Sequence, residues 1–222
     1  MTRSLAYRAA GEGIGAAFLV MAVVGSGIMA DALSGGNAAL ALLCNTIATA
    51  GALLALILAI GPVSGAHFNP AVSVVEVLAG RMPWRDLPAY LGAQFTGAVA
   101  GVWVAHAMFA LPLVQVATKV RAGPAQWLSE VVATSGLLLV IAGCAARDRA
   151  VGSITTPVAV AAYIGAAYWF TASTSFANPA VTVARALSDT FAGIRPADAG
   201  LFIVAQVIAV GIVVGANRLR RA

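Results

Sequence analysis

The chain has 222 residues, of which 61% are hydrophobic and only 9% are charged, and its formal net charge is +5. A soluble domain carries roughly 25% charged residues, so this composition excludes a cytosolic enzyme, a nucleic-acid binder or a disordered regulator. The length suits one membrane domain of about six spans, because each span needs ~20 mostly apolar residues.

Six stretches are long and apolar enough to cross a bilayer. In chain order they are residues 9–30, 38–60, 88–111, 126–146, 151–171 and 200–217. The sequence therefore predicts an all-α membrane protein whose six transmembrane helices form one domain over residues 1–222. The two cysteines, Cys44 and Cys144, lie within or at the end of these stretches. We interpret them as packed thiols that form neither a disulfide nor a metal site.

Basic residues are distributed unevenly between the two sides of the predicted membrane. With six spans both termini lie on one side, and the segments on that side hold nine Arg residues. The segments on the opposite side hold four basic residues: Lys119, Arg121, Arg185 and Arg195. Because basic residues accumulate in cytoplasmic loops, we expect both termini to lie in the cytoplasm.

A seven-residue motif occurs twice. Residues 69–75 read Asn-Pro-Ala-Val-Ser-Val-Val, and residues 178–184 read Asn-Pro-Ala-Val-Thr-Val-Ala. Each copy follows the second predicted span of its half, and a glutamate, Glu12 or Glu130, stands near the start of the first span of each half. The pattern indicates an internal repeat rather than two chance helix starts.

The two copies divide the chain into residues 1–115 and 116–222, with three spans each. Because three is an odd number, the second half must enter the membrane with the opposite orientation to the first. The sequence therefore predicts two inverted repeats related by a pseudo-two-fold axis in the membrane plane, an architecture of channels and secondary transporters.

Each copy of the motif predicts the start of a short helix. Asn is a favoured N-cap and Pro is favoured at the first helical position. We expect short helices over residues 70–78 and 179–187, the first preceded by a break at Gly61, Pro62 and Gly65. A helix of ~10 residues is ~15 Å long, half the ~30 Å thickness of the hydrocarbon core. Two such half-helices entering from opposite sides would meet N-terminus to N-terminus at the midplane.

This arrangement has an electrostatic consequence at the centre of the membrane. Each helix N-terminus carries the positive end of a dipole, and two of them opposed at a narrow point repel cations, including protons. The side-chain oxygens of Asn69 and Asn178 would cap their own helices, which turns the amide N–H groups toward a permeating oxygen.

These residues resemble the aquaporin (major intrinsic protein) family. Residues 64–72 read Ser-Gly-Ala-His-Phe-Asn-Pro-Ala-Val, close to the family's first signature, and residues 178–180 match the core of its second. The resemblance covers nearly the whole chain, including both first-span glutamates. It is strongest to aquaglyceroporin-like bacterial members with a changed second motif, which are linked to arsenic resistance. It places the pore constriction at Asn69, Pro70, Ala71, Asn178, Pro179 and Ala180.

The resemblance implies six transmembrane helices plus two half-helices, with a pore in every subunit of a homotetramer. It implies passive conduction of water or small uncharged solutes in a lipid bilayer, for this chain the bacterial inner membrane. No cofactor, metal or nucleic-acid partner is expected.

The sequence departs from the family at the selectivity filter. Family members usually carry Arg three residues after the second Asn, where this chain has Val181. Counting residues from Asn69 and Asn178 places the four filter positions in this chain. They are Thr49, Ala166, Val181 and a loop position that is either Ser175 or Phe176. Because this set is small and uncharged, we expect an opening too wide to exclude small polyols or other hydroxylated solutes by size.

Two charged residues stand seven positions after the capping asparagines. Arg185 lies about one helical turn beyond Val181 on the same face, and helical side chains lean toward the N-terminus. It either reaches the filter as a displaced arginine or binds loop carbonyls near the surface. Its counterpart Glu76 is expected to pair with Arg81 or Arg85.

Two glutamates and two histidines in apolar surroundings need an assignment. Glu12 and Glu130 fit either ion coupling or the acceptance of backbone hydrogen bonds from the half-helix loops. Their symmetric placement favours the second role. His67 is expected to line the pore or anchor its loop, and His106 to be a packing residue.

The leading hypothesis is a passive channel for water, glycerol-like polyols and neutral metalloid hydroxides such as arsenite. The alternatives are a channel for arsenic oxyanions or methylarsenicals, an ion-coupled carrier that uses the two glutamates, and a structural membrane protein with a closed pore. An enzyme is disfavoured because the sequence shows no nucleophile–base set, metal-ligand cluster or phosphate-binding glycine loop.

Overall fold

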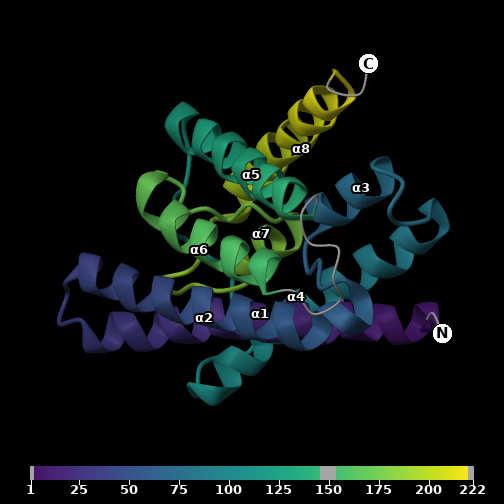
Figure 1. The fold of residues 1–222 in the computed structure, drawn as a ribbon. Helices are drawn as coiled ribbons and strands as arrows, with labels where there is room; N and C mark the ends of the chain where they lie inside the picture. The colour runs from purple at the N-terminus through teal and green to yellow at the C-terminus, as the bar shows by residue number, and fades with distance from the viewer. Residues whose placement is uncertain (1–2, 146–153, 220–222) are drawn as a thin grey trace.

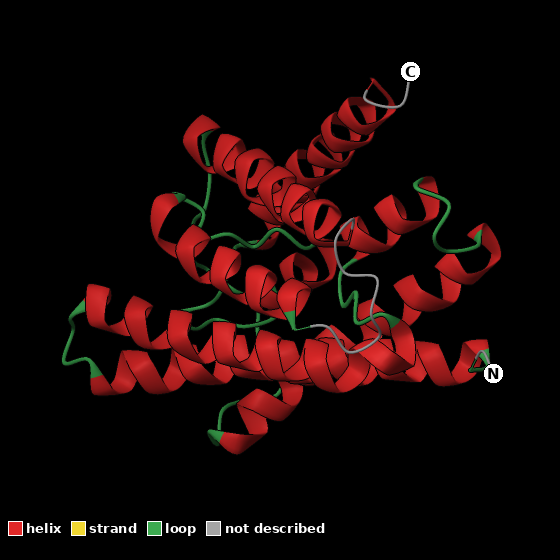
Figure 2. Ribbon diagram, viewed as in Figure 1, coloured by secondary structure: helices red, strands yellow, loops and turns green. Residues whose placement is uncertain are grey.

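The computed structural model describes residues 3–145 and 154–219, and within these ranges every regular element is a helix (Figures 1 and 2). The elements are α1 (Leu5–Leu33), α2 (Ala38–Ser64), α3 (Pro70–Leu78), the short 3-10 helix η1 (Trp84–Asp86), α4 (Leu87–Met108), α5 (Pro124–Ala145), α6 (Thr155–Phe170), α7 (Pro179–Arg185) and α8 (Pro196–Leu219). The predicted all-α fold is confirmed, with a helix at each of the six predicted spans.

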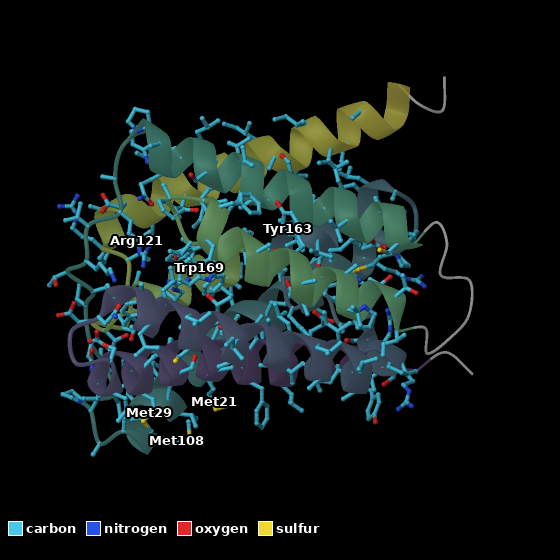
Figure 3. All side chains as sticks on the ribbon, turned by 60° about the vertical axis from the view of Figure 1, so that its left-hand side comes forward. Met21, Met29, Met108, Arg121, Tyr163 and Trp169 are labelled. Atoms are coloured by element: carbon cyan, nitrogen blue, oxygen red, sulfur yellow. The ribbon has the colours of Figure 1, made fainter. Side chains whose placement is uncertain are left out.

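Four of the helices qualify as membrane spans by length and apolar composition alone. They are Leu5–Leu33, Ala38–Ser64, Pro124–Cys144 and Pro196–Ala216. The other two predicted spans correspond to α4 and α6, and the predicted start of the fifth span, residues 151–153, lies outside the described residues. The start of α1 and the end of α8 lie toward the same side of the molecule, at the right of Figures 1 and 3.

Several predicted boundaries differ from the structure by a few residues, and two of the differences have a local cause. Helix α2 does not end at Ile60 but continues through Pro62 to Ser64, where Gly65 ends it at φ 93°. A proline in the last turn removes one intrahelical hydrogen bond, and glycine adopts the left-handed conformation at little cost. Helix α7 ends at Arg185 rather than at residue 187, because the N–H groups of Ala186 and Leu187 donate three residues back, to the Val183 and Ala184 carbonyls, instead of continuing the four-residue ladder.

The two short helices begin as the motif predicts. The Asn69 side-chain oxygen accepts from Ala71 N at 2.9 Å at the start of α3. The Asn178 side-chain oxygen accepts from Ala180 N at 3.0 Å and from Val181 N at 3.2 Å at the start of α7. Both asparagines adopt extended backbone conformations, so the chain enters each short helix from a loop rather than from a preceding helix.

The long helices pack around these short ones. Helix α1 lies along α2 and α4, and α5 lies along α8, with α7 in the middle of the assembly (Figure 1). Helices α1 and α4 approach so closely that a Cβ at Gly97 would lie 2.1 Å from the Gly13 carbonyl oxygen. Small residues at such crossings allow backbones to meet.

The prediction that both cysteines are packed thiols fails at one of them. Cys44 is exposed on α2, and Cys144 is half-buried on α5. The prediction of a packed thiol is therefore wrong for Cys44. A continuous apolar run does not reveal which face of a membrane helix points outward, because lipid-facing and buried positions are equally apolar.

Candidate permeation path

The path is built from the two loops that precede the short helices. Ala66 and Phe68 before α3, and Ser175 and Ala177 before α7, adopt φ values of 51°, 50°, 51° and 48°. Non-glycine residues rarely adopt this left-handed region, so the conformation persists only when surrounding contacts hold it. The two loops share the conformation at matching positions relative to Asn69 and Asn178.

Glu12 holds the first loop. One carboxylate oxygen accepts from Ser64 Oγ at 2.6 Å and His67 N at 3.0 Å, and the other accepts from Phe68 N at 2.7 Å and Gln94 Nε2 at 2.8 Å. The side chain is fully buried in α1. These bonds satisfy loop N–H groups that the membrane interior would leave unpaired.

Glu130 holds the second loop in the same way. Its two oxygens accept from Phe176 N and Ala177 N, each at 2.9 Å, and Gln206 Nε2 donates to it at 2.7 Å. Gln206 also donates to Thr182 Oγ1, as Gln94 donates to Ser73 Oγ in the first half. With their oxygens occupied by loop donors, the contacts of both glutamates match the loop-supporting role.

The two motifs meet at the centre of the molecule. Asn69 Nδ2 donates to the Ala177 carbonyl at 2.7 Å, and Asn178 Nδ2 donates to the Phe68 carbonyl at 2.8 Å. A primary amide has two N–H donors, so each asparagine retains one for another acceptor. This differs from the expectation that both amide donors face the lumen, because the loop carbonyl of the opposite half takes one of them.

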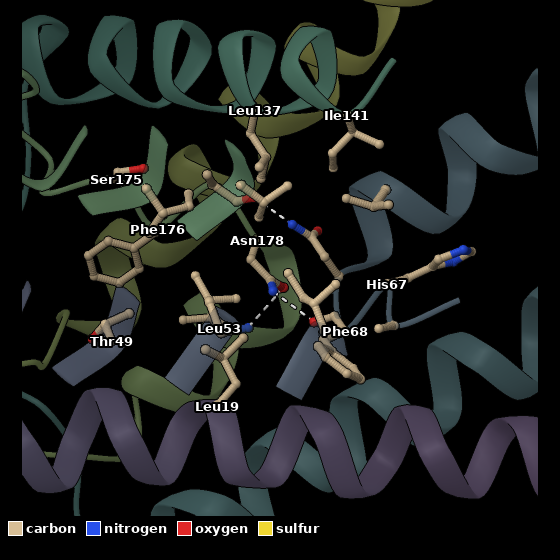
Figure 4. Close-up of a pocket in the computed structure, with 18 of the residues that line it drawn as sticks. Leu19, Thr49, Leu53, His67, Phe68, Leu137, Ile141, Ser175, Phe176 and Asn178 are labelled. Atoms are coloured by element: carbon tan, nitrogen blue, oxygen red, sulfur yellow. Dashed lines mark hydrogen bonds between the residues drawn. The ribbon is translucent and has the colours of Figure 1, made fainter. Parts of the chain in front are cut away.

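A cavity of about 280 Å³ passes between the motifs. Figure 4 shows Thr49, Ser175 and Phe176 toward one end, His67 toward the other, and Asn178 with Phe68 between them. We call the two ends the Arg185 end and the Glu76 end, after the charged residue in each wall. Much of the remaining wall is aliphatic and is formed by Leu19, Val23, Leu53, Ile57, Leu137, Ile141, Val160 and Ile164.

The predicted filter residues are only partly brought together. Thr49, Ser175, Phe176 and Val181 all line the cavity. Ala166 does not: it is exposed on the outside of α6, and the prediction for this position is wrong.

The cavity face of α6 carries Val160, Ile164 and Tyr168, which are spaced four residues apart. Residues with this spacing share one face of a helix, whereas Ala166, two residues away from the nearest of them, points to the opposite side. Tyr168 therefore stands at this point of the wall, and its hydroxyl donates to Thr49 Oγ1 at 3.3 Å. Rings of Tyr168 and Phe176 occupy space that the expected alanine would have left open.

The side chain of Arg185 lies in the cavity wall and also binds a loop carbonyl, so its position fits both alternatives that the sequence left open. It lines the cavity although its side chain is only 2% exposed, and its Nε donates to the Ala192 carbonyl. Its guanidinium carbon lies 3.4 Å from the centroid of the Phe176 ring, a cation–π contact. It is thus held by a loop carbonyl and an aromatic ring at the same time.

The Glu76 end is organised by an ion pair. Both carboxylate oxygens of Glu76 accept from Arg81, from Nε and Nη2, each at 2.6 Å, so Arg81 rather than Arg85 is the partner. His67 lines the wall nearby and its Nδ1 lies 3.0 Å from Ser73 Oγ. It therefore faces the cavity and anchors its loop.

Sequence reasoning missed two residues that help to form the Arg185 end of the cavity. Tyr168 could have been found from the helical phase of α6, by extending the apolar face of Val160 and Ile164 by one turn. Arg121, in the connection between α4 and α5, is buried beside the Arg185 end, and burial lowers its pKa to about 10. His106, on α4, is buried with Nε2 at 2.9 Å from Ser188 Oγ, in the packing role expected of it.

Comparison with known proteins settles the family. The profile described as "Major intrinsic protein" matches residues 2–175. The chain belongs to the major intrinsic protein family. Members of this family are channels and not enzymes, so this chain is an integral membrane channel protein.

Relatives and a solved structure agree with this assignment. The chain is 54% identical to "Aquaglyceroporin AqpS" of Rhizobium meliloti (strain 1021), over 92% of this chain and 85% of the relative. It is 31% identical to "Aquaporin NIP1-3" of Oryza sativa subsp. japonica, over 82% of this chain and 64% of the relative. The X-ray structure of the aquaglyceroporin from Plasmodium falciparum matches with a TM-score of 0.62 at 22% identity, over 95% of this chain and 93% of that one. This chain and the Plasmodium falciparum protein share the aquaporin fold.

Proposed function

We propose that this protein is a passive channel for small uncharged solutes: water, glycerol-like polyols and neutral metalloid hydroxides such as arsenite. The observation that carries the proposal is that one cavity contains both Asn69 and Asn178 and extends from Glu76 to Arg185. The names of two relatives, both aquaglyceroporins, support glycerol as a substrate.

The wall of the cavity offers both kinds of contact that a polyol needs. Its aliphatic side chains face the carbon backbone of the solute, and hydrogen-bonding groups serve its hydroxyls. Ser175 Oγ lies in this wall and is buried without a hydrogen-bond partner in the described part of the chain. Buried polar groups of this kind are satisfied by water or a ligand.

Exclusion of cations and protons is assigned to the centre of the path. The N-termini of α3 and α7 point their positive dipole ends at the same place. The remaining N–H of each asparagine would bind a water oxygen and turn that water out of line with its neighbours. A proton wire would be interrupted there, and a cation would be repelled.

A second candidate, passage of oxyanions or methylarsenicals, is favoured by the charges near the Arg185 end. Arg185 and Arg121 are buried without an ion-pair partner in the described part of the chain. Lys119 is close enough to both for their charges to lower its pKa. Uncompensated cations attract anions, although dehydration of the anion opposes entry.

The proposal extends to the arrangement in the membrane. We place the protein in the bacterial inner membrane as a homotetramer with both termini in the cytoplasm, so that the Glu76 end faces the cytoplasm. We assign residues 1–115 and 116–222 to two inverted repeats. The matching glutamate networks and the reciprocal asparagine bonds support this division.

The test is light scattering of proteoliposomes in a stopped-flow instrument, with an inward gradient of glycerol and a sucrose control. Wild type would be compared with Val181→Arg, which puts a long charged side chain into the wall, and with Val181→Ile, which adds bulk without charge. We expect rapid glycerol re-swelling in wild type, strong slowing by Arg and little by Ile. If the vesicles shrink by water efflux but glycerol does not enter, the protein conducts water and not glycerol. No permeation at all would favour the closed-pore alternative.

Arsenite and arsenate uptake would then separate the two candidates. Arsenite is neutral near pH 7 whereas arsenate is charged, so a channel for uncharged solutes takes up the first alone. Dependence of either flux on a proton or sodium gradient would instead indicate a carrier.

A further inference from the structure

A second buried arginine ties together the loops around the Arg185 end. Arg121 is 8% exposed and lies, in Figure 3, at the end of the molecule away from the start of α1 and the end of α8. Its Nε donates to the Gly193 carbonyl at 2.9 Å, and its Nη1 donates to the Ser173 carbonyl at 3.2 Å. One side chain thus joins the loop that precedes α7 to the loop that follows it.

The Phe176 ring connects this arginine to the cavity wall. The guanidinium carbon of Arg121 lies 5.0 Å from the ring centroid, and that of Arg185 lies 3.4 Å from it. The ring also packs against Phe202 with centroids 5.1 Å apart and planes at 75°. Glu130 fixes the Phe176 backbone through its N–H. The position of the ring therefore depends on both arginines.

The two guanidiniums are also held by neighbouring carbonyls. Ala192 O accepts from Arg185 and Gly193 O accepts from Arg121. Neither arginine forms an ion pair within residues 3–145 and 154–219. Two buried like charges without carboxylates are costly. Both are held by this turn and the shared aromatic ring, and Arg121 is also held by the Ser173 carbonyl of the loop before α7.

We propose that Arg121 is a positioning residue for solute selectivity. By holding the Phe176 ring and the turn at Ala192 and Gly193, it fixes where the Arg185 guanidinium stands and so sets the width of the cavity at that end. Arg121 itself is not in the cavity wall. The inference rests on the proposed function as a solute channel.

The experiment measures permeability to water, glycerol and the larger polyol erythritol in proteoliposomes. The variants are Arg121→Met, which removes the charge at similar length, and Arg121→Lys, which keeps the charge but loses the planar fork. The matched control is Arg85→Met, because the Arg85 side chain is 86% exposed and does not stack on Phe176. We expect both Arg121 variants to raise the erythritol-to-water ratio, roughly fivefold for Met, the scale of one lost cation–π contact. The control should leave the ratio unchanged.

A Phe176→Ala background tests whether Arg121 acts through the ring. If it does, Phe176→Ala alone changes the ratio, and adding Arg121→Met changes it little further, because residues that act as one unit are not additive. An equal effect of Arg121→Met with and without the ring would overturn the proposal. So would an unchanged ratio in Arg121 variants that still conduct water.

A readout without solute flux keeps this proposal separate from the proposed function. With Cys44 and Cys144 replaced by Ser, Val181→Cys places a thiol in the cavity wall, and its rate of modification by a bulky methanethiosulfonate reports the width at the Arg185 end. We expect Arg121→Met to speed this modification whether or not the protein conducts glycerol. Equal rates would overturn the positioning role even if glycerol permeation is established.

Discussion

Glu76 and Arg185 occupy the same place in their respective motifs, seven residues after the capping asparagine, and they line opposite ends of one cavity. Their charges are handled differently. Glu76 is neutralised by a two-bond pair with Arg81, whereas Arg185 is held by a carbonyl and an aromatic ring. One end of the cavity is therefore locally balanced in charge, and the other end remains cationic.

If oxyanions pass, the cationic end should make their entry sensitive to pH through Lys119. Burial, followed by the charges of Arg121 and Arg185, lowers the Lys119 pKa to about 8, and Asp31 opposes the shift. Above that pH the ammonium loses its proton, so the positive charge at this end falls. If oxyanions pass, nitrate influx should fall severalfold between pH 7 and 9 while glycerol influx stays constant. Nitrate keeps its charge over this range.

The matched variant is Lys119→Met, which should give a nitrate influx that no longer changes with pH. Absence of nitrate influx at every pH would rule against the oxyanion candidate. Glycerol influx that varied with pH in wild type and Lys119→Met alike would assign the effect to another group.

Asn178→Asp should open the centre of the path to cations. Aspartate is as good an N-cap as asparagine, so α7 should still form. The carboxylate cannot donate to the Phe68 carbonyl, and it adds negative charge where two positive dipole ends meet. We expect sodium or proton influx to rise roughly tenfold, which corresponds to about 1.4 kcal/mol less repulsion. A pH-sensitive dye inside proteoliposomes measures the proton component.

Asn37→Asp is the control for that change, since Asn37 caps α2 at an exposed position outside the cavity. It should leave cation influx at the wild-type value. If Asn178→Asp conducts water normally but admits no cations, exclusion is set elsewhere in the cavity.

Glu12→Gln should destabilise the fold. A glutamine amide N–H would face donors that the carboxylate now satisfies, including Phe68 N and Gln94 Nε2. Leaving buried donors unpaired costs about 1–3 kcal/mol, which should lower the melting temperature of the detergent-solubilised protein by several degrees. The exposed Asp31→Asn serves as the control and should not change it. An unchanged melting temperature together with the loss of a gradient-driven flux would revive the ion-coupling role.

Gly15→Ala should be destabilising because of one ring. A Cβ at Gly15 would lie 1.9 Å from Phe68 Cε1, and overpacking of this kind costs about 1–3 kcal/mol. Phe68→Ala alone should cost about 3–5 kcal/mol because the ring is buried, but in that background Gly15→Ala should cost less, because the ring that its methyl group would strike is gone. Gly51→Ala, where nothing lies within 4 Å of the added atom, should be neutral or stabilising. Thermal unfolding of the wild type, the three single variants and the double variant measures this, and an equal cost of Gly15→Ala with and without the Phe68 ring would contradict it.

The short helices were predictable because their signals are local. An asparagine followed by a proline caps a helix wherever the pair stands, and repetition of the motif pointed to a shared centre. The Ala166 assignment failed because the position was carried over by counting residues from the capping asparagines. Which face of α6 meets the cavity depends on helical phase, and only the spacing of Val160, Ile164 and Tyr168 reveals it. Arg121 lies in a connection without periodicity, so no sequence pattern linked it to Phe176.

The reciprocal bonds between Asn69 and Ala177 and between Asn178 and Phe68 also bear on biosynthesis. During synthesis the first half is complete before residue 177 exists, so the Asn69 amide enters the membrane without its final acceptor. An unpaired polar group in hydrocarbon is costly, and the half-made chain must keep this region hydrated or shielded until the second half arrives. The centre of the path is therefore among the last parts to form. A chain that stops between the two motifs should be retained by quality control rather than accumulate as half a channel.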